Sequence, residues 1–479
     1  MVRPTAPGVP IRRRSAFLRT VEDLSAPLHA LRAHFDSGAT RPYAARRAAL
    51  RALRAAIRRH EEELLAALHS DMRKPRFEAY MADIGLVYAE IDHALKHLRG
   101  WMRAEHRPTP LALQPSRCAL HPEPLGVVLI IAPWNYPFLL LMNPLVGAVA
   151  AGCCVVAKPS NEAPATARVT ERIIREVFAP EQVLVVQGAG RSVGPRLIEP
   201  FRFDHIFFTG SPGVGRSIMA LAAPHLTPVT LELGGKSPAI VDDTADVERA
   251  AQRIVWSRFL NAGQTCIATD HVLVHERVKD RFLAAAQRYV QQFYGPDPQR
   301  SPHYARLVND TRFQQVKRYL DHGRIVIGGQ HDAADRYIAP TILTDVSLDS
   351  PPMREEIFGP LLPVIAWRER EEARVIVARN PHPLALYVFS SDRANQRYFT
   401  EGIAFGGGCI NQCMLQFGNA DLPVGGVGTS GIGSYHGKAT FDRFTHHKPL
   451  VFGSTLLEPG IQYPPFSRWK EKVLRWVLG

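Results

Sequence analysis

From Leu125 onward, short apolar runs alternate with helical segments, and this alternation constrains the fold more than any other feature of the chain. Residues 127–132 and 154–158 are largely apolar runs of strand length, and an amphipathic helix is predicted over 164–177. Strands that are apolar on both sides and joined through helices form parallel sheets covered on both faces. The sequence therefore predicts an α/β fold of doubly wound parallel sheets, with ligands bound at the carboxyl ends of the strands.

A second segment of the same kind runs from Glu232 to about Cys413, so the 479 residues form more than one domain. Upstream, residues 42–72 and 76–105 each predict one long amphipathic helix. The Pro-rich stretch 107–124 predicts an extended excursion or hairpin. Residues 443–452 predict a strand that pairs either with this excursion or with another subunit.

Composition and charge limit the classes of function. The net charge is +13, but no nucleic-acid-binding motif is present, so we interpret the Arg-rich helix faces as solvated surface. The six cysteines lack the spacing of a disulfide framework or a zinc site, which favours reduced thiols, a cytoplasmic location and no metal. No secretory signal is recognisable at the N-terminus, and the apolar stretch 138–152 is too short to span a bilayer.

The last residues, 454–479, form an amphipathic tail in which Trp and Leu alternate with Arg and Lys. Such a segment either touches a membrane surface weakly or packs on its own protein. It is not a transmembrane anchor, and we expect no integral membrane association.

Cys266 and Glu232 are the first candidate catalytic pair. Cys266 closes the sequence Asn-Ala-Gly-Gln-Thr-Cys after a predicted helix over 246–260, and Glu232 lies 34 residues upstream. A thiol that attacks a carbonyl carbon and a carboxylate that later activates water suit a two-step acyl transfer. A lone cysteine is more often a small buried apolar residue, so this prediction depends on the motifs that accompany it.

Two motifs at predicted strand ends suit anionic groups. Asn135 follows the strand over 127–132, where its amide can donate to an oxyanion or simply stabilise a turn. The sequence 207–215 ends a strand and opens a helix through Gly, Ser and Pro, which presents free N–H groups to a pyrophosphate. The glycines of 187–194 have the wrong spacing for a dinucleotide fingerprint and predict a turn.

Two further motifs suit a nucleotide. Lys158 ends the strand over 154–158 and can reach a ribose or phosphate, although an exposed Lys is the usual alternative. In residues 355–360, a carboxylate of Glu355 or Glu356 can bind ribose hydroxyls and Phe358 can back an aromatic ring. A charged helix end before a turn is the structural alternative for this motif.

Together these motifs resemble the aldehyde dehydrogenase family over about residues 35–447. The resemblance is carried by PWNYPF at 133–138, KPS at 158–160, FTGSPGVG at 208–215, LELGGKSP at 231–238, GQTC at 263–266 and EEIFGP at 355–360. Residues 225–230, 336–346, 383–387 and 433–438 resemble the class-3 branch, with bacterial coniferyl aldehyde dehydrogenases in the same neighbourhood. That branch handles medium- and long-chain aliphatic and aromatic aldehydes.

The resemblance implies NAD(P)-dependent oxidation of such aldehydes to carboxylic acids through a cysteine thiohemiacetal and thioester. It implies that Cys266 is the nucleophile, and that Asn135 and the Cys266 backbone N–H form the oxyanion hole. Glu232 would activate the hydrolytic water, with Glu356 as a rival for that role. The implied cofactor-binding residues are Trp134, Lys158, Ser160, Asn161, Thr209, Gly210, Ser211, Gly215, Glu356 and Phe358.

One residue departs from the family pattern. The usual acidic residue after Lys-Pro-Ser is replaced by Asn161, and Glu162 follows one place later. In the family that carboxylate grips the adenosine ribose and repels a 2′-phosphate. An amide removes the repulsion, so either NAD or NADP is expected as cofactor, with NADP tolerated at least as well as in typical members.

The resemblance also implies a cofactor domain, a catalytic domain, a small β oligomerisation arm and a homodimer. The predicted division is a basic flexible N-terminus at 1–15, a dinucleotide-binding domain at 16–106 and 125–231, a catalytic domain at 232–413, the arm and C-terminal segment at 107–124 and 414–453, and the tail at 454–479. Two alternatives stay open. A CoA-acylating enzyme of the same fold has no need of Glu232, and a non-catalytic structural or binding protein is indicated only by the positive charge.

Overall fold

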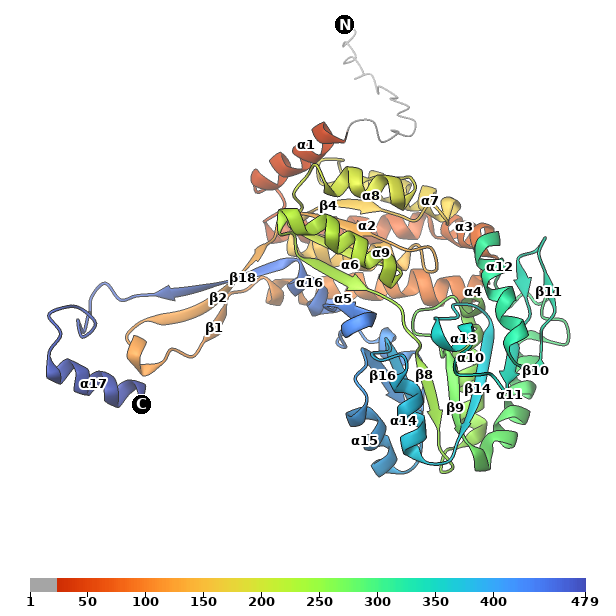
Figure 1. Ribbon diagram of the computed structural model, residues 1–479. Helices are drawn as coiled ribbons and strands as arrows, with labels where there is room; N and C mark the ends of the chain where they lie inside the picture. Colours follow the sequence, from red (N-terminus) through yellow and green to blue (C-terminus); the bar gives the residue numbers. More distant parts are fainter. Residues whose placement is uncertain (1–23) are drawn as a thin grey trace, which may run out of the picture.

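Two α/β units follow one another along the chain, and a slender β arm projects from the first (Figure 1). The structure is a computed structural model that describes residues 24–479, so the N-terminus predicted at 1–15 lies outside the described residues. Both units are built on mainly parallel sheets, which confirms the predicted fold class.

The first sheet has six strands in the order β17-β7-β6-β3-β4-β5, all parallel except the pair β17 and β7. Its strands are β3 (Val127–Ile131), β4 (Cys154–Lys158), β5 (Val183–Val185), β6 (His205–Thr209), β7 (Val229–Glu232) and β17 (Gly431–Ile432). Because β3, β6 and β7 are parallel neighbours, the loops that follow them open at the same edge of the sheet. That edge is where an open parallel sheet binds ligands.

Helices cover both faces of this sheet because its strands are apolar on both sides. In β3, Val128 and Ile130 join one buried cluster, whereas Val127, Leu129 and Ile131 join another. The first cluster includes residues of α2 (Tyr43–Arg59), α3 (Glu61–Met72), α5 (Gly85–Trp101), α6 (Leu139–Ala151), α7 (Pro164–Val177) and α16 (Gly437–Arg443). The second includes residues of α1 (Ser25–Asp36), α8 (Gly190–Ile198) and α9 (Pro212–Ala222).

The second sheet has seven strands in the order β10-β13-β14-β9-β8-β15-β16, parallel except where β10 meets β13. They are β8 (Pro238–Val241), β9 (His271–His275), β10 (Arg324–Ile327), β13 (Thr341–Thr344), β14 (Leu361–Trp367), β15 (Ala385–Phe389) and β16 (Gly407–Ile410). A small hairpin, β11 (His331–Asp332) and β12 (Tyr337–Ile338), lies beside it. The helices of this unit are α10 (Val247–Phe259), α11 (Lys279–Tyr294), α12 (Asp310–Arg318), α13 (Pro351–Arg354), α14 (Arg370–Ala378) and α15 (Arg393–Gly402).

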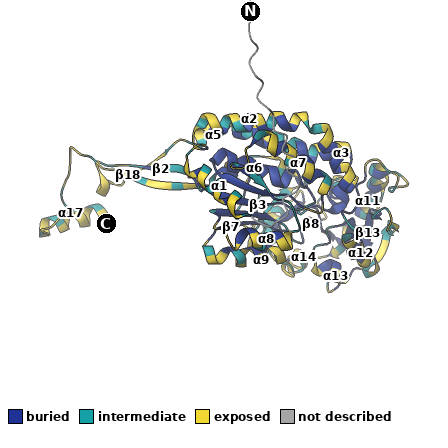
Figure 2. Cartoon of the chain, turned by 90° about the horizontal axis from the view of Figure 1, so that it is seen from above, coloured by how far each residue is buried: buried dark blue, intermediate teal, exposed yellow. Residues whose placement is uncertain are grey.

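The arm is an antiparallel sheet of β1 (Glu105–Arg107), β2 (Arg117–Pro124) and β18 (Thr445–Phe452). Its longest pairing joins β2 to β18, from Thr445 opposite Pro124 to Phe452 opposite Arg117. The excursion and the late strand thus pair with each other, one of the two pairings that the sequence leaves open. Beyond β18 the chain ends in α17 (Arg468–Leu478), which has no buried residue, and the arm with this helix stands clear of the body (Figure 2).

One helix prediction is wrong in its continuity, and a second misses a π-helical turn. The helix predicted over 42–72 is two helices, because the backbone leaves helical geometry at His60 (φ −102°, ψ 10°) between α2 and α3. The helix predicted over 76–105 begins with the short α4 (Arg76–Ala79), passes through a π-helical turn over Tyr80–Ile84 and continues as α5. The π-helical turn covers only five residues within a longer helical run, so the helical pattern of 76–105 does not reveal it.

Candidate active site

A cavity of about 580 Å³ opens at the carboxyl ends of β3, β6 and β7, where the first sheet meets the second unit. Its volume lies within the range of pockets that enclose a small-molecule ligand. The cavity is lined by nine of the residues predicted from the sequence, which are Trp134, Asn135, Thr209, Gly210, Ser211, Glu232, Cys266, Glu356 and Phe358. Residues from at least five separate segments of the chain therefore converge on one space.

Four predicted residues do not line this cavity. Lys158 ends β4 but is only 3% exposed, and its Nζ donates to the Pro159 carbonyl at 3.2 Å, so it is not the exposed Lys of the alternative reading. Ser160 is buried beside it, Asn161 is exposed, and Gly215 lies buried within α9. Burial lowers the pKa of Lys158.

The nucleophile loop follows α10 and is tightly wound. Asn261 and Ala262 have φ values of 52° and 51°, which side-chain-bearing residues adopt rarely. Gly263 follows at φ +75°, and a Cβ there would lie 2.3 Å from the Gly359 carbonyl oxygen. This sharp turn brings Cys266 to the cavity wall, half-buried rather than enclosed.

Asn135 lies directly across from the nucleophile loop. Its Nδ2 donates to the Gln264 carbonyl at 3.0 Å, and the neighbouring Tyr136 hydroxyl bonds to the Thr265 hydroxyl at 2.6 Å. An amide NH₂ group carries two hydrogens, so the bond to Gln264 leaves one for an oxyanion. Since Asn135 and Cys266 both line the cavity, the arrangement can hold a carbonyl group between them.

The electrostatics of the cavity favour protonated groups. Burial and, to a smaller extent, the nearby Glu356 and Glu232 carboxyls together raise the pKa of the Cys266 thiol to about 12. Burial also raises the pKa of Glu356 to about 8 and that of Glu232 well above its ordinary value. The thiol is therefore protonated at neutral pH, and forming the thiolate requires a base within the cavity.

Glu232 is the last residue of β7 and is only 4% exposed. Its Oε1 has no hydrogen-bond partner anywhere in residues 24–479, and the Arg443 charge only partly offsets the effect of burial on its pKa. A buried carboxyl oxygen without a partner is costly unless a ligand or water meets it. Glu232 is thus free to exchange a proton with a molecule in the cavity.

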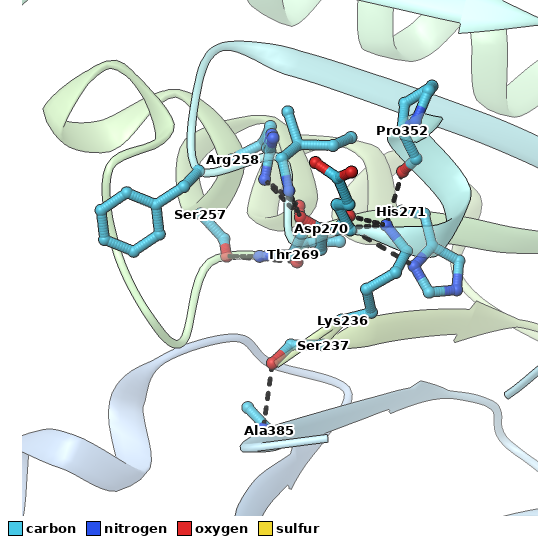
Figure 3. Close-up of polar contacts among 12 residues, drawn as sticks. Lys236, Ser237, Ser257, Arg258, Thr269, Asp270, His271, Pro352 and Ala385 are labelled. Atoms are coloured by element: carbon cyan, nitrogen blue, oxygen red, sulfur yellow. Dashed lines mark hydrogen bonds and ion pairs between the residues drawn. The ribbon is translucent and has the colours of Figure 1, made fainter. Parts of the chain in front are cut away.

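A buried ion pair holds the loop that carries Glu356. Lys236 forms an ion pair with Asp270, and its Nζ also donates to the Pro352 carbonyl at 2.6 Å (Figure 3). The same Nζ donates to the Glu355 carbonyl at 3.1 Å. The other oxygen of Asp270 accepts from the Ile357 N–H at 2.9 Å. The backbone on both sides of Glu356 is therefore fixed to the base of the second sheet.

The mouth of the cavity suits a dinucleotide. Thr209, Gly210 and Ser211 join β6 to α9, whose first N–H groups can bind a phosphate. The Thr209 Oγ1 is buried and meets no hydrogen-bond partner in the described part of the chain. A Cβ at Gly210 would lie 2.5 Å from the Phe208 ring, so the backbone there must stay bare.

An aromatic pair completes the opposite wall. Trp134 and Phe358 meet edge to face with ring centroids 5.4 Å apart, and both line the cavity. Arg312, which the sequence does not single out, donates to the carbonyls of Ile357 at 2.7 Å and Phe358 at 3.1 Å. This aromatic wall, the free N–H groups at the start of α9 and the unpartnered Thr209 hydroxyl together fit a nicotinamide dinucleotide.

Glu162 is a further cavity residue, and it follows the departure at Asn161. Its two carboxylate oxygens accept from the Asn161 amide at 2.8 Å and from the Asn309 amide at 2.9 Å. Asn309 precedes α12 in the second unit, so this contact bridges the two units at the cavity. The sequence offers one signal for Glu162, an acidic residue one place beyond the expected position, and none for Asn309.

The comparisons with known proteins identify the family. The model of the aldehyde dehydrogenase family matches residues 15–450. The chain belongs to the aldehyde dehydrogenase family. It is 44% identical to the 4,4′-diaponeurosporen-aldehyde dehydrogenase of Staphylococcus aureus over 91% of this chain and 95% of that protein. It is also 44% identical to human aldehyde dehydrogenase family 3 member B1 over 95% of this chain and 97% of that protein.

Comparison with solved structures supports the same family. A substrate-bound Staphylococcus aureus aldehyde dehydrogenase matches with a TM-score of 0.93 and 41% identity, covering 95% of this chain and all of that one. An indole-3-acetaldehyde dehydrogenase in complex with NAD⁺ matches with a TM-score of 0.83 and 29% identity, covering 91% and 89%. The predicted family and fold are confirmed. This aldehyde dehydrogenase is an oxidoreductase that converts aldehydes to carboxylic acids, and the CoA-acylating and non-catalytic alternatives are not favoured.

Proposed function

We propose that this aldehyde dehydrogenase oxidises medium- or long-chain aliphatic or aromatic aldehydes, with Cys266 as the nucleophile. The observation that carries the proposal is the convergence of Cys266, Asn135, Glu232 and Glu356 on one cavity. The names of two relatives, a diaponeurosporen-aldehyde and an indole-3-acetaldehyde dehydrogenase, support large apolar substrates. A panel of aliphatic and aromatic aldehydes, followed by reduced nicotinamide, tests the substrate class. A marked preference for short polar aldehydes would contradict it.

The first half of the reaction forms a bond at sulfur. A cavity carboxylate takes the Cys266 proton, and the sulfur attacks the aldehyde carbon to give a tetrahedral thiohemiacetal. The developing oxyanion accepts hydrogen bonds from the Asn135 amide and the Cys266 backbone N–H. Losing one such donor typically costs about 10²–10³-fold in rate. When bound, the nicotinamide ring supplies the acceptor for the hydride that leaves this carbon, and the acyl group then remains on sulfur as a thioester.

The second half breaks that bond. Glu232 takes a proton from water as the water attacks the thioester carbon, and the C–S bond breaks to return the thiol and release the acid. The raised pKa of Glu232 suits a proton acceptor, and its partnerless oxygen leaves room for the water. Glu356, with a pKa of about 8, is the rival for this role, and otherwise it binds the nicotinamide ribose.

Stopped-flow kinetics separates these two carboxyls. Glu232→Gln is expected to retain a burst of about one reduced nicotinamide per site and then turn over slowly, because acyl transfer proceeds but hydrolysis does not. Glu356→Gln is the matched variant and is expected to raise the KM for the cofactor. The opposite pattern would move the base to Glu356.

We propose that the enzyme uses NAD or NADP. Trp134, Thr209, Gly210, Ser211, Gly215 and Phe358 are proposed to line its path, with Lys158, Ser160 and Asn161 at the adenosine end. The amide of Asn161 supports acceptance of a 2′-phosphate, whereas the Glu162 carboxylate that it holds opposes it. Comparing kcat/KM for both cofactors in the wild type and in Asn161→Glu tests this. A strong NAD preference in the wild type would contradict NADP tolerance.

We also propose a cytoplasmic homodimer assembled through the arm, with weak membrane-surface contact by α17. Within the described residues, no helix has both the length and the apolar character that crossing a bilayer needs. The exposed side chains of Trp469 and Trp476 lie in α17 among Arg and Lys, which supports contact with anionic headgroups. Sedimentation equilibrium and flotation with anionic vesicles test the two statements. A monomer, or a protein equally bound to neutral vesicles, would contradict them.

A further inference from the structure

A fully buried ion pair lies behind the loop that carries Asn135. Lys74 Nζ and Asp83 Oδ2 are 2.6 Å apart, and both side chains are 0% exposed. Burying two charges requires hydrogen bonds that satisfy their remaining donors and acceptors. The other hydrogen-bond partners of Lys74 and Asp83 therefore indicate why the pair is buried at this place.

The ion pair is hydrogen-bonded to the main chain at both ends of the loop 135–139. Lys74 Nζ also donates to the Asn135 carbonyl oxygen at 3.0 Å, and Asp83 Oδ1 accepts from the Leu139 N–H at 3.2 Å. Leu139 is the first residue of α6, so the pair joins the start of the loop to the helix that follows it. Lys74 further lies 4.2 Å from the centre of the Tyr136 ring, which closes the space between these two anchors.

The second unit supports the same carbonyl group. Asn261 Nδ2 donates to the Asn135 carbonyl oxygen at 2.9 Å and to the Gln264 carbonyl at 3.2 Å. The Gln264 carbonyl is also the acceptor of the Asn135 side-chain amide. Both the main chain and the side chain of Asn135 are thus hydrogen-bonded to the nucleophile loop. Lys74 binds the Asn135 carbonyl from the first unit.

The local backbone that delivers the pair is unusual. Asp83 lies in the π-helical turn over Tyr80–Ile84, and Arg73, just before Lys74, has a φ of 48°. π-Helical turns cost stability and occur often at functional sites. The chain therefore departs from regular helix at both places where it supplies a member of the pair.

We propose that Lys74 and Asp83 are positioning residues that hold the Asn135 amide at the oxyanion. This inference rests on the proposed oxyanion role of Asn135. A donor acts fully only within a few tenths of an ångström and about 10–20° of the productive geometry. A tilt of the Asn135 peptide moves Nδ2 with it, so the pair sets the rate of the acylation step without touching the substrate.

A double-mutant cycle tests the proposal. Lys74→Gln together with Asp83→Asn keeps hydrogen-bonding groups of similar size but removes both charges. We expect kcat/KM for the aldehyde and the burst rate to fall about 10- to 10²-fold, below the about 10²–10³-fold expected for Asn135→Ala. The KM for the cofactor should be unchanged. In the Asn135→Ala background, the neutral pair should cost no more than about 2-fold, because its effect passes through Asn135.

The matched control is the ion pair of Arg32 and Asp204. Its side chains are 2.6 Å apart, and Asp204 also accepts from the Val127 N–H at 2.7 Å, but neither residue lines the cavity. Arg32→Gln with Asp204→Asn should lower the melting temperature and leave kcat/KM unchanged. If the neutral Lys74 pair does not fold, Asp83→Glu replaces it, since that variant keeps both charges but shifts the anchor by one methylene.

The outcomes are distinct. A loss of the same size in the Asn135→Ala background would show that the pair acts independently of Asn135 and would overturn the proposal. A lowered melting temperature with unchanged burst rate would make the pair purely structural and would overturn it as well. Wild-type activity of Asn135→Ala would remove the oxyanion role on which the inference rests, whereas the assignment of Cys266 would stand.

Discussion

Gly234 lies so close to Glu356 that adding a single methyl group there should displace the Glu356 carboxylate. It lies on the loop between Glu232 and Lys236, and a Cβ at Gly234 would stand 2.0 Å from Oε2 of Glu356 and 2.7 Å from its Cδ. The backbone of Gly234 is not in the left-handed region, so alanine is tolerated by the main chain there. Gly234→Ala therefore acts by pushing the Glu356 carboxylate aside.

The size of the effect follows from this distance. Ordinary contact begins at 3.4 Å, so Oε2 must retreat by about 1.4 Å. The carboxylate that must move is the one that accepts a hydrogen bond from the Gly235 backbone, and this bond lowers the pKa of Glu356. A displacement of about 1 Å in a catalytic geometry can cost about 10²-fold in rate, which corresponds to about 2.7 kcal/mol of transition-state free energy.

Steady-state kinetics with both substrates measures this. We expect kcat/KM to fall about 10²-fold in Gly234→Ala, with a raised KM for the cofactor. The control is Gly100→Ala in α5, where a new Cβ meets no described atom within 4 Å outside its chain neighbours and its own helix backbone. That variant should keep full activity and gain about 0.4–1 kcal/mol of stability. Wild-type kinetics in Gly234→Ala would refute the argument that the position of Glu356 matters.

Three further predictions concern the same cavity. Because Glu356 has a pKa of about 8 and is proposed to bind the nicotinamide ribose as a carboxylate, the KM for the cofactor in the wild type should rise as the pH drops below about 8; a KM that is flat down to pH 5 would contradict this. Asp270→Asn leaves the Lys236 ammonium without its carboxylate, so the free energy of unfolding, measured in urea, should fall by about 3–5 kcal/mol. Thr209→Val removes a buried hydroxyl that has no partner within the described residues, so the melting temperature should hold while the KM for the cofactor rises several-fold; an unchanged KM would exclude a contact with the cofactor.

The sequence predicts the fold and most of the cavity wall for a definite reason. Glycines and polar residues that follow apolar strands mark the carboxyl edge of a parallel sheet, and that edge is one place in space. Asn135 and the turn within 207–215 are therefore found from local pattern. Cys266, Glu232 and Glu356 are candidates from their residue types, and the resemblance to the family is needed to place them in one site.

Other parts of the site have no such signal. Lys74 and Asp83 belong to a segment that reads as an ordinary charged helix surface, and they are buried only because the loop of Asn135 folds over them. Asn309 reaches Glu162 from the other unit, more than 140 residues away in sequence. The apolar spacing of residues 42–72 continues through His60, so the sequence pattern does not show that the backbone leaves helical geometry there.

Direct detection of the acyl group on Cys266 tests the account most closely. The Glu232→Gln enzyme is mixed with an aromatic aldehyde and NAD, quenched in acid within the burst and digested for mass spectrometry. We predict one acyl group per chain, on the peptide that contains Cys266 and on none of the peptides with the other five cysteines. A burst of reduced nicotinamide without any modified cysteine, or an acyl group on Cys409 or Cys413 instead, would contradict the assignment of the nucleophile.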